Sequence, residues 1–209
     1  MDVTIIGTGN MGRAIGRRLV EGGNRVTVLG KETRNAEAVV EELGGADSAQ
    51  AGRSGEAIAD DVVVLAVYYP DAKAAVEQYR DGLSGKVVVD ITNPVNETFD
   101  GLVTPPDSSA AQELAASAPG ARFVKAFNTT FAGTLADGEV AGQRLDVLLA
   151  SDDDDAKATV AKLVEDGRLR PIDVGPLKRA RELEAAGLLH MLVQGPLGTG
   201  FGSALKIVS

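Results

Sequence analysis

The chain has 209 residues and a formal net charge of −9, with 44% hydrophobic and 24% charged residues. This balance is ordinary for a globular domain, and the acidic surplus disfavours nucleic acid and anionic membranes as main partners, because both reward a basic surface. The absence of cysteine excludes disulfides, thiolate metal sites and cysteine nucleophiles. The sequence shows no signal-peptide pattern and no transmembrane stretch, so we expect a cytoplasmic protein.

The first half of the chain alternates apolar, strand-like runs with helical segments. The run at 62–67 (VVVLAV) is typical of a central strand, because continuous β-branched residues are expected where both faces of a sheet are covered. Strands are also predicted at 3–6, 25–29 and 86–91, and helices at 11–21, 36–43 and 72–79. This alternation predicts a parallel sheet with right-handed crossovers.

The second half of the chain is less regular. Residues 97–109 predict a long loop, and helices are predicted at 110–117, 154–165 and 177–194, with strands at 122–125, 144–150 and 170–174 and a strand-like end at 205–208. We expect an α/β fold, a Rossmann-type doubly wound and mainly parallel sheet with a small C-terminal helical cap. Residues 1–130 are expected to form the dinucleotide-binding domain, and 131–209 to continue the α/β layer and complete a second-cofactor pocket.

A G-x-G-x-x-G motif joins the first predicted strand to the first predicted helix. It consists of Gly7, Thr8, Gly9, Asn10, Met11 and Gly12. The pattern alone is weak, but here it follows a strand and opens a helix within a unit of about 30 residues. Gly7 permits the tight turn, Gly9 lets the backbone approach a pyrophosphate, and Gly12 lets helix and strand pack closely. A glycine turn without a ligand is the alternative.

The end of the second predicted strand bears on the choice between NAD and NADP. Gly30 stands where an acid that binds the ribose of NAD is often found. Lys31, Thr33 and Arg34 are candidates to bind a 2′-phosphate, whereas Glu32 is a candidate for a ribose diol. We therefore favour NADP(H) over NAD(H). The alternative for Lys31 and Arg34 is a solvated helix start.

Other predicted strand ends supply further candidates, because ligands of open α/β sheets lie outside the carboxyl ends of the strands. Tyr68 and Tyr69 are candidates to pack on the dinucleotide, with rim packing as the alternative. Asn93, which precedes Pro94, and Asn128 are candidates to orient the nicotinamide amide. Turn formation before proline is the alternative for Asn93.

No acid–base constellation is recognisable, and we predict neither a catalytic side chain nor a metal ligand. The single histidine, His190, lies in an apolar run and is interpreted as a satisfied core or interface residue. The four acids at 152–155 are expected to cap the helix that follows. Hydride transfer between two bound cofactors needs orientation more than a protein acid, since the cofactors supply the chemistry.

These features together resemble the family of F420-dependent NADP oxidoreductases, in which NADPH and the deazaflavin coenzyme F420 exchange a hydride. The chain is also similar to the cytoplasmic reductase domain of the STEAP metalloreductases. The similarity covers nearly the whole chain, through the glycine motif, residues 124–129, residues 169–177 and the glycine-rich end at 197–207. The block at 169–177 (LRPIDVGPL), in order with the others, is the most specific mark.

The resemblance implies a set of binding residues. It places the pyrophosphate at 8–11, the 2′-phosphate at 31–34, the ribose and adenine beside Val67, Tyr68 and Tyr69, and the nicotinamide along Asn128, Thr129 and Ala132. It implies a wall for a stacked deazaflavin at Leu197, Gly198, Gly200 and Phe201. Archaeal members tend to carry Ser-Arg in place of Lys31-Glu32, a difference that bears on the choice of NADP. They also tend to carry His in place of Asn128, where Asn is closer to the STEAP-like pattern, and this leaves a flavin or another small acceptor open beside F420.

The sequence therefore predicts an NADPH-dependent oxidoreductase whose acceptor is coenzyme F420 or a flavin. The alternatives are a dinucleotide-sensing module without turnover and an NAD(P)-dependent reductase of a small substrate. β-Hydroxyacid and imine-type dehydrogenases need a large all-helical C-terminal domain, which the short sequence after Gly175 does not predict. The last long helix is apolar over much of its length, so we expect a homodimer. Packing wholly on its own sheet is the alternative for this helix.

Overall fold

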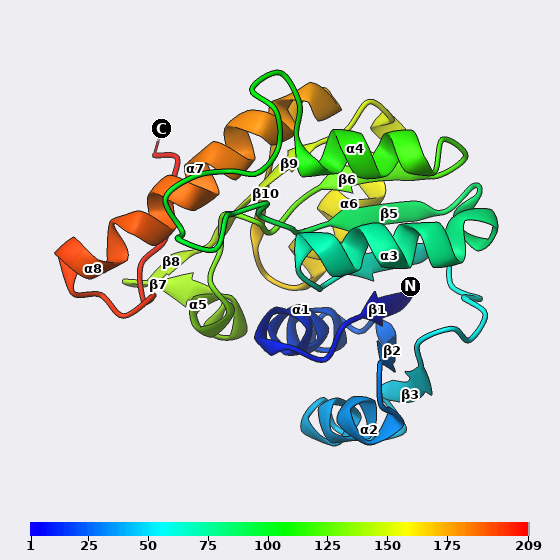
Figure 1. Cartoon of the computed structure of the whole chain (residues 1–209). Helices are drawn as coiled ribbons and strands as arrows, with labels where there is room; N and C mark the ends of the chain where they lie inside the picture. Colours follow the sequence, from blue (N-terminus) through cyan, green and yellow to red (C-terminus); the bar gives the residue numbers. More distant parts are fainter. Residues whose placement is uncertain (209) are drawn as a thin grey trace.

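The apolar runs of the sequence assemble into one sheet. In the computed structural model, which describes residues 1–208, eight strands form a sheet in the order β10-β9-β6-β5-β4-β1-β2-β3 (Figure 1). Six of them are mutually parallel in the Rossmann order. These are β1 (Asp2–Ile6), β2 (Arg25–Gly30), β3 (Ala49–Arg53), β4 (Val62–Leu65), β5 (Val87–Asp90) and β6 (Arg122–Lys125). The predicted Rossmann-type, mainly parallel α/β fold is confirmed.

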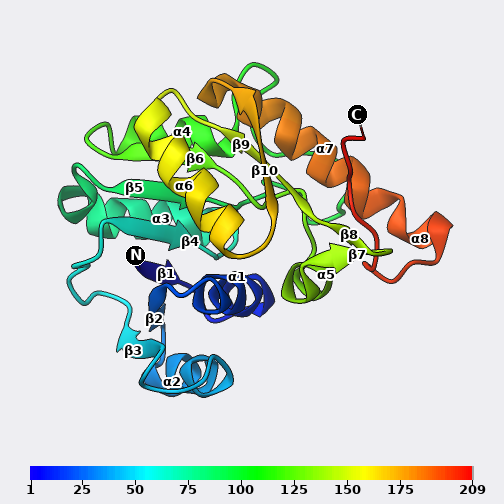
Figure 2. The same ribbon diagram turned by 180° about the vertical axis from the view of Figure 1, so that it is seen from behind.

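Helices cover both faces of this sheet. Successive side chains of each strand point to opposite faces, so each face carries apolar side chains that a helix must cover. Val62 and Val64 pack into one apolar cluster, whereas Val63 and Leu65 pack into the other. Burial of each such side chain contributes about 1.5–3 kcal/mol, so both faces of β4 need a cover. The covers are α1 (Asn10–Glu21), α2 (Thr33–Glu42), α5 (Ala132–Asp137) and α6 (Asp154–Asp166) on one face, and α3 (Tyr69–Tyr79), α4 (Ala110–Ser117) and the start of α7 (Ala180–Leu192) on the other. Helices α3 and α4 lie in front of the sheet in Figure 1, and α6 lies in front in Figure 2.

The last two strands of the sheet depart from the predicted parallel alternation. Strand β9 (Asp146–Ala150) pairs antiparallel with β6 through Lys125 and Ala150, and β10 (Arg170–Gly175) runs parallel to β9. Between β6 and β9 the chain forms α5 and a small hairpin of β7 (Glu139–Val140) and β8 (Gln143–Arg144). The chain therefore enters β9 from the edge where β6 ends, without the helical crossover that a parallel neighbour requires.

Several other predictions from the sequence are wrong in detail. Strand β3, α5 and the β7–β8 hairpin were not predicted, and β3 (AQAGR) contains no β-branched residue. The predicted helix at 177–194 is divided into a 3-10 turn (Leu177–Arg179), α7 and α8 (Gln194–Leu197). The predicted strand at 205–208 forms no ladder, because its backbone bonds a side chain instead: Ile207 N donates to Asp146 Oδ2 at 2.8 Å.

The acidic run before α6 caps that helix as predicted. The side chain of Asp153 accepts a hydrogen bond from Ala156 N at 2.8 Å, and two more acids occupy the first turn. Within residues 1–208, no group of His, Cys, Asp and Glu side chains is arranged to hold a metal ion. None of the helices in that range is both long and apolar enough to span a membrane.

Candidate functional site

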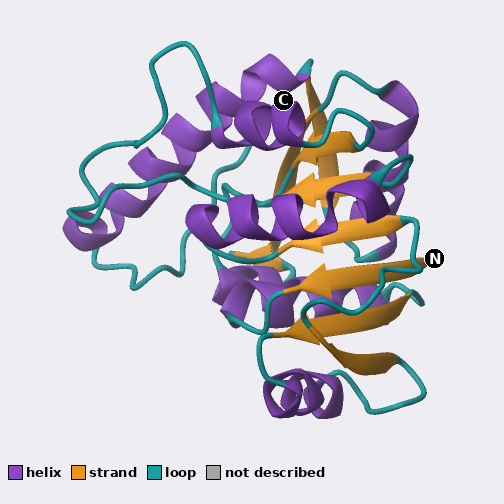
Figure 3. Ribbon diagram, turned by 45° about the vertical axis from the view of Figure 1, so that its right-hand side comes forward, coloured by secondary structure: helices purple, strands orange, loops and turns teal. Residues whose placement is uncertain are grey.

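The six parallel strands bring their carboxyl ends to one edge of the sheet, where the candidate residues gather. The arrowheads of the central strands in Figure 3 point toward this edge. The glycine motif follows β1, residues 67–69 follow β4, Asn93 follows β5 and Asn128 follows β6. The topology therefore places four separate stretches of sequence at one edge of the fold.

The backbone of the glycine motif is shaped by close contacts at Gly7 and Gly12. Gly7 has φ +125°, and a Cβ there would lie 2.2 Å from Ala66 O. A Cβ at Gly12 would lie 2.5 Å from Gly7 O, so only glycine allows α1 to pack this closely on the loop. At Gly9, by contrast, a Cβ would meet nothing within 4 Å. The motif is therefore tightly packed on its inner side and open at Gly9.

Helix α1 begins at Asn10 directly after this opening. Its N-cap is Gly9, and no side chain accepts a hydrogen bond from the first turn. The N–H groups at a helix start have no partners within the helix, and together with the helix dipole they favour an anion. Thr8 and Met11 are half-buried beside the opening, and Asn10 is exposed. The residues present therefore fit a diphosphate held by backbone N–H groups.

The end of β2 lies against the same loop. A Cβ on Gly30 would lie 3.0 Å from the Cγ2 methyl of Thr8. The next residue, Lys31, has an exposed side chain whose Nζ lies 2.8 Å from Asp71 Oδ1 at the start of α3. Exposed ion pairs of this kind contribute about 0–1 kcal/mol, so Lys31 can exchange its carboxylate partner for a phosphate.

The start of α2 supplies the other predicted 2′-phosphate contacts. Arg34 Nη2 lies 2.5 Å from Glu32 Oε2, and both side chains are mainly exposed. Thr33 is exposed and opens the helix, with Glu32 as its N-cap. Glu32 therefore pairs with Arg34 in this structure, and this exposed ion pair is as weak as that of Lys31.

The two adjacent tyrosines point into different environments. Tyr68 is the N-cap of α3 and is 82% exposed, whereas Tyr69 is 6% exposed in the apolar cluster under α3 and α4. The Tyr69 hydroxyl donates a hydrogen bond to Glu113 on α4, and burial together with this carboxylate raises the pKa of Tyr69. The expectation that both tyrosines pack on a dinucleotide is therefore corrected: Tyr68 and the half-buried Val67 lie at the open edge, and Tyr69 belongs to the core.

Asn93 and Asn128 form a hydrogen-bonded pair, the amide pair, at the ends of β5 and β6. Asn93 Nδ2 donates to Asn128 O at 2.8 Å, and Asn128 Nδ2 donates to Asn93 Oδ1 at 2.9 Å and to Leu183 O at 2.8 Å. Asn128 is 4% exposed, and its Oδ1 is buried without a partner among the described residues. A buried acceptor left unpaired calls for an explanation, and an amide N–H of a nicotinamide carboxamide is a donor of the kind it lacks.

A fully buried charge cluster adjoins the amide pair, and the sequence analysis missed it. Lys125 Nζ donates to Asp90 Oδ2 at 2.8 Å, to Thr92 O at 2.5 Å and to Glu184 Oε1 at 2.8 Å, and all three charged side chains are 0% exposed. Glu184 also accepts from the first two N–H groups of α4, at 3.0 and 3.3 Å. Burial raises the pKa of Glu184, against the opposing effect of Lys125. We call Asp90, Lys125 and Glu184 the inner cluster.

His190 on α7 is a satisfied core residue, as interpreted from the sequence. Its side chain is 3% exposed, with Nδ1 3.2 Å from Thr129 O and Nε2 2.9 Å from Ser203 Oγ. Burial lowers the pKa of His190, which favours the neutral ring. The ring also lies 4.3 Å from that of Phe131. His190 thus joins α7 to the segment after β6 and to the tail.

The glycine-rich tail reaches the predicted nicotinamide segment through two aromatic rings. Phe201 is 53% exposed, and its ring stands edge-on to that of Phe131 at a centroid distance of 5.0 Å. Gly198 and Gly200 have positive φ values of 64° and 56°, and Leu197 is 63% exposed. The structure therefore brings the tail beside residues 128–132, which include the buried Thr129 and the half-buried Ala132.

A second charge cluster ties the end of the tail to the sheet. Asp146 accepts hydrogen bonds from Arg170 at 2.7 and 2.6 Å, from Lys206 Nζ at 2.5 Å and from Ile207 N at 2.8 Å. Burial alone would raise the pKa of Asp146, but the bonds from Arg170 and Lys206 lower it to about 2. We call Asp146, Arg170 and Lys206 the outer cluster.

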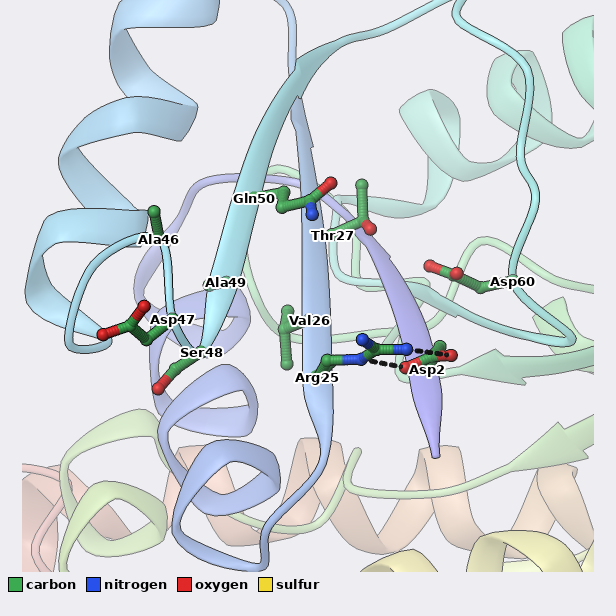
Figure 4. Close-up of a pocket in the computed structure, with 10 residues that line it drawn as sticks. All are labelled: Asp2, Arg25, Val26, Thr27, Ala46, Asp47, Ser48, Ala49, Gln50 and Asp60. Carbon is green, nitrogen blue, oxygen red and sulfur yellow. Dashed lines mark hydrogen bonds and ion pairs between the residues drawn. The ribbon is translucent and has the colours of Figure 1, made fainter.

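A shallow hollow at the opposite edge of the sheet is not part of this site. It has a volume of about 170 Å³ and lies where β1, β2 and β3 begin (Figure 4). Its charged lining consists of Asp2, Asp47, Asp60 and Arg25, and Arg25 is paired with Asp2 at 2.7 Å. A lining with this acidic surplus does not suit a phosphate ligand.

Comparison with known proteins assigns a family to this arrangement. The family model described as "NADP oxidoreductase coenzyme F420-dependent" matches residues 2–94. The chain is 31% identical over 199 residues to the F420-dependent NADP reductase of Methanothermobacter thermautotrophicus, covering 88% of this chain and 85% of that protein.

Two further comparisons cover most of this chain. It is 31% identical over 186 residues to the metalloreductase STEAP3 of Rattus norvegicus, covering 89% of this chain but only 36% of the rat protein. Among solved structures, a putative F420-dependent NADP reductase of Arthrobacter sp. FB24 superposes with a TM-score of 0.87 at 27% identity over 99% of both chains.

Proposed function

Since the chain belongs to the family of F420-dependent NADP oxidoreductases, we propose that it transfers a hydride between NADP(H) and coenzyme F420 or a flavin. The observation that carries the proposal is the uncapped start of α1 with open space at Gly9. An acceptor of the F420 type is supported by the archaeal relative, which shares 85% of its length with this chain. When bound, the nicotinamide and the deazaflavin or flavin supply the redox chemistry.

In this proposal the N-terminal part of the chain, residues 1–130, binds the nucleotide. The backbone of residues 8–11 holds the diphosphate, and Val67 and Tyr68 flank the ribose and adenine. Lys31, Thr33 and Arg34 hold the 2′-phosphate after Lys31 and Arg34 release their carboxylate partners. Two cations at this point favour NADP(H) over NAD(H).

The remaining part, 131–209, continues the sheet and supplies the second pocket; residue 209 lies outside the described residues. We assign the nicotinamide side to residues of the strand ends: Asn93, Pro94, Asn128, Thr129 and Ala132. We assign the acceptor side to residues of the tail: Leu197, Gly198, Gly200 and Phe201. Placing two cofactors against each other in this way supplies the orientation that hydride transfer requires.

Nucleotide specificity is tested by calorimetry with NADPH and NADH. Lys31→Ala combined with Arg34→Ala is expected to weaken NADPH binding by about tenfold or more, because two charge-assisted contacts are lost, and to leave NADH binding unchanged. Arg25→Ala is a matched control, because Arg25 is an exposed cation at the opposite edge of the sheet. An equal loss of affinity for NADPH and NADH in the double variant would contradict the assignment of Lys31 and Arg34 to the 2′-phosphate.

Turnover is tested by following nicotinamide absorbance with F420, FMN and FAD as separate acceptors. Oxidation of NADPH by F420 or a flavin supports the proposal. Tight NADPH binding without turnover of any acceptor overturns it in favour of a sensing module.

We further propose that the protein is a cytoplasmic homodimer. Leu189 and Leu192 on α7 are 63% and 47% exposed. A second copy of the chain would cover these side chains. Light scattering of the wild type and of Leu189→Glu tests this, and a wild-type monomer at micromolar concentration would overturn it.

A further inference from the structure

Two members of the inner cluster bind the backbone N–H and C=O groups of Thr92, the residue before Asn93. Asp90 Oδ1 accepts from Thr92 N at 2.9 Å, and Lys125 Nζ donates to Thr92 O at 2.5 Å. These two hydrogen bonds therefore fix the backbone of Thr92, which lies between β5 and Asn93. Lys125 is also the last residue of β6, three positions before Asn128.

Helix α7 meets the amide pair from the other side at two successive levels. Leu183, next to Glu184, accepts the hydrogen bond from Asn128 Nδ2 at 2.8 Å. One turn later, a Cβ on Gly187 would lie 2.6 Å from Asn93 Oδ1 and 3.1 Å from Asn128 O. Helix α7 therefore accepts a hydrogen bond from the amide pair at Leu183 and packs closely against the pair at Gly187.

The inner cluster is not explained by stability alone. Removing three charged groups from water is costly, and apolar side chains of similar volume often stabilise a fold as well or better. A buried ionic network does fix geometry, because each hydrogen bond has a required direction and each broken bond is costly. Here the fixed geometry is that of β5, β6 and α7 around the amide pair.

We propose that Asp90, Lys125 and Glu184, together with Gly187, are positioning residues that hold the amide pair for the nicotinamide end of the cofactor. This inference rests on the proposed function. The cluster acts through Thr92 and Leu183 on the pair, and the pair keeps Asn128 Oδ1 without a protein partner. The specific consequence is that disturbing these residues weakens binding of the nicotinamide half of the ligand and spares the adenine half.

Two variants disturb the pair by independent routes. In Glu184→Gln, an NH2 group replaces one carboxylate oxygen and faces either Lys125 or the first N–H groups of α4, so one link of the cluster is lost. Gly187→Ala brings a methyl group against Asn93 and changes no charge. Asp153→Ala is the matched control, since it removes the cap of α6 and costs about 1 kcal/mol of stability away from the amide pair.

The test compares two ligands by calorimetry: NADP+ and adenosine 2′,5′-bisphosphate, which lacks the nicotinamide half. For Glu184→Gln and Gly187→Ala we expect NADP+ affinity to fall about five- to tenfold, the effect of one misplaced hydrogen bond. Affinity for the bisphosphate should be unchanged. Asp153→Ala should change neither affinity.

Hydrogen exchange of the ligand-free chain supplies a second readout. The amides of Thr92, Asn93 and Asn128 should exchange faster in the two test variants and not in the control. Parallel weakening of both ligands, or unchanged NADP+ affinity, would overturn the inference alone. A wild-type chain that binds neither ligand would overturn the proposed function, and this inference with it.

Discussion

The inner cluster places one cation between two carboxylates, whereas the outer cluster places one carboxylate, Asp146, between two cations. All three side chains of the inner cluster are 0% exposed. In the outer cluster Asp146 is buried, but the side chains of Arg170 and Lys206 are 37% and 24% exposed. Carboxylate–cation pairs therefore occur in this chain both fully buried, in the inner cluster, and partly exposed to solvent, in the outer cluster.

The partners of the two acids account for the opposite directions of their pKa shifts, because Glu184 shares one cation with the carboxylate of Asp90, whereas Asp146 is bound by two cations. For Glu184, burial is the largest effect and raises the pKa. For Asp146, burial is also the largest single effect and raises the pKa, but the hydrogen bonds from Arg170 and Lys206 together outweigh it, and the pKa falls to about 2. Desolvation therefore opposes ionisation of Glu184 in the inner cluster. In the outer cluster, the ionised form of Asp146 is stabilised by its partners, and it attaches the tail to the sheet.

The largest expected effect is that of removing the one cation of the inner cluster. Lys125→Met leaves Asp90 and Glu184 buried without a counter-charge, which should lower the free energy of unfolding by about 3–5 kcal/mol. Urea denaturation measures this loss. The triple variant Asp90→Asn, Lys125→Met, Glu184→Gln should recover most of it because no buried charge remains. A Lys125→Met variant as stable as the wild type would show that solvent reaches the cluster.

The next effect is a loss of stability in the outer cluster that depends on pH. The pKa of Asp146 in the folded chain, about 2, lies below its ordinary value of 3.8. Its contribution is therefore complete above pH 3.8 and disappears as the pH falls through about 2. Asp146→Asn should cost about 2 kcal/mol at pH 7 and progressively less in acid. Urea denaturation at pH 2 to 7 measures this, and a cost independent of pH would contradict it.

Glu184→Gln should show the opposite dependence on pH. The pKa of Glu184 is raised above its ordinary value of 4.5 by burial. The stability gained from its neutral form is therefore present below pH 4.5 and is lost as the pH rises through the folded pKa. The advantage of the wild type over Glu184→Gln, about 1 kcal/mol in acid, should shrink toward neutral pH. An advantage that grows with pH would contradict this.

The smallest effect is expected for Lys206, the second cation of the outer cluster. Lys206→Met leaves Arg170 on Asp146 and should cost less than about 1 kcal/mol. Added salt should reduce this difference, because the pair is reached by solvent. Limited proteolysis of residues 198–208 supplies the second readout, since the tail loses one of its attachments. If Lys206→Met lost as much stability as Lys125→Met, the outer cluster would not differ from the inner cluster in its contribution to stability.

The parts of the molecule that the sequence predicted well are those with local signals. The turn at Gly7 and the β-branched run of β4 require only neighbouring residues to be recognised. Strand β3 carries no such signal, and it forms because β2 offers an edge to pair with. The direction of β9 also follows from where α5 and the β7–β8 hairpin lie, which no local pattern expresses.

The inner cluster was not predictable, because its members are far apart in the chain. Lys125 lies 35 residues from Asp90 and 59 from Glu184. The available signal was a charged residue closing each of two apolar strands, VVVD and RFVK. The two tyrosines show the same limit: Tyr68, the extended N-cap of α3, is exposed, whereas Tyr69, the first residue of the helix, is buried.

Buried hydrogen bonds attach α7 to the ends of the central strands along its length. Glu184 is bonded to Lys125, Leu183 to Asn128 and His190 to Thr129. With these buried attachments α7 travels with the sheet as a single block. In the tail beyond α7, Gly198 and Gly200 adopt left-handed backbone conformations that other residues rarely accept, so the path of the chain toward Phe201 depends on these two glycines.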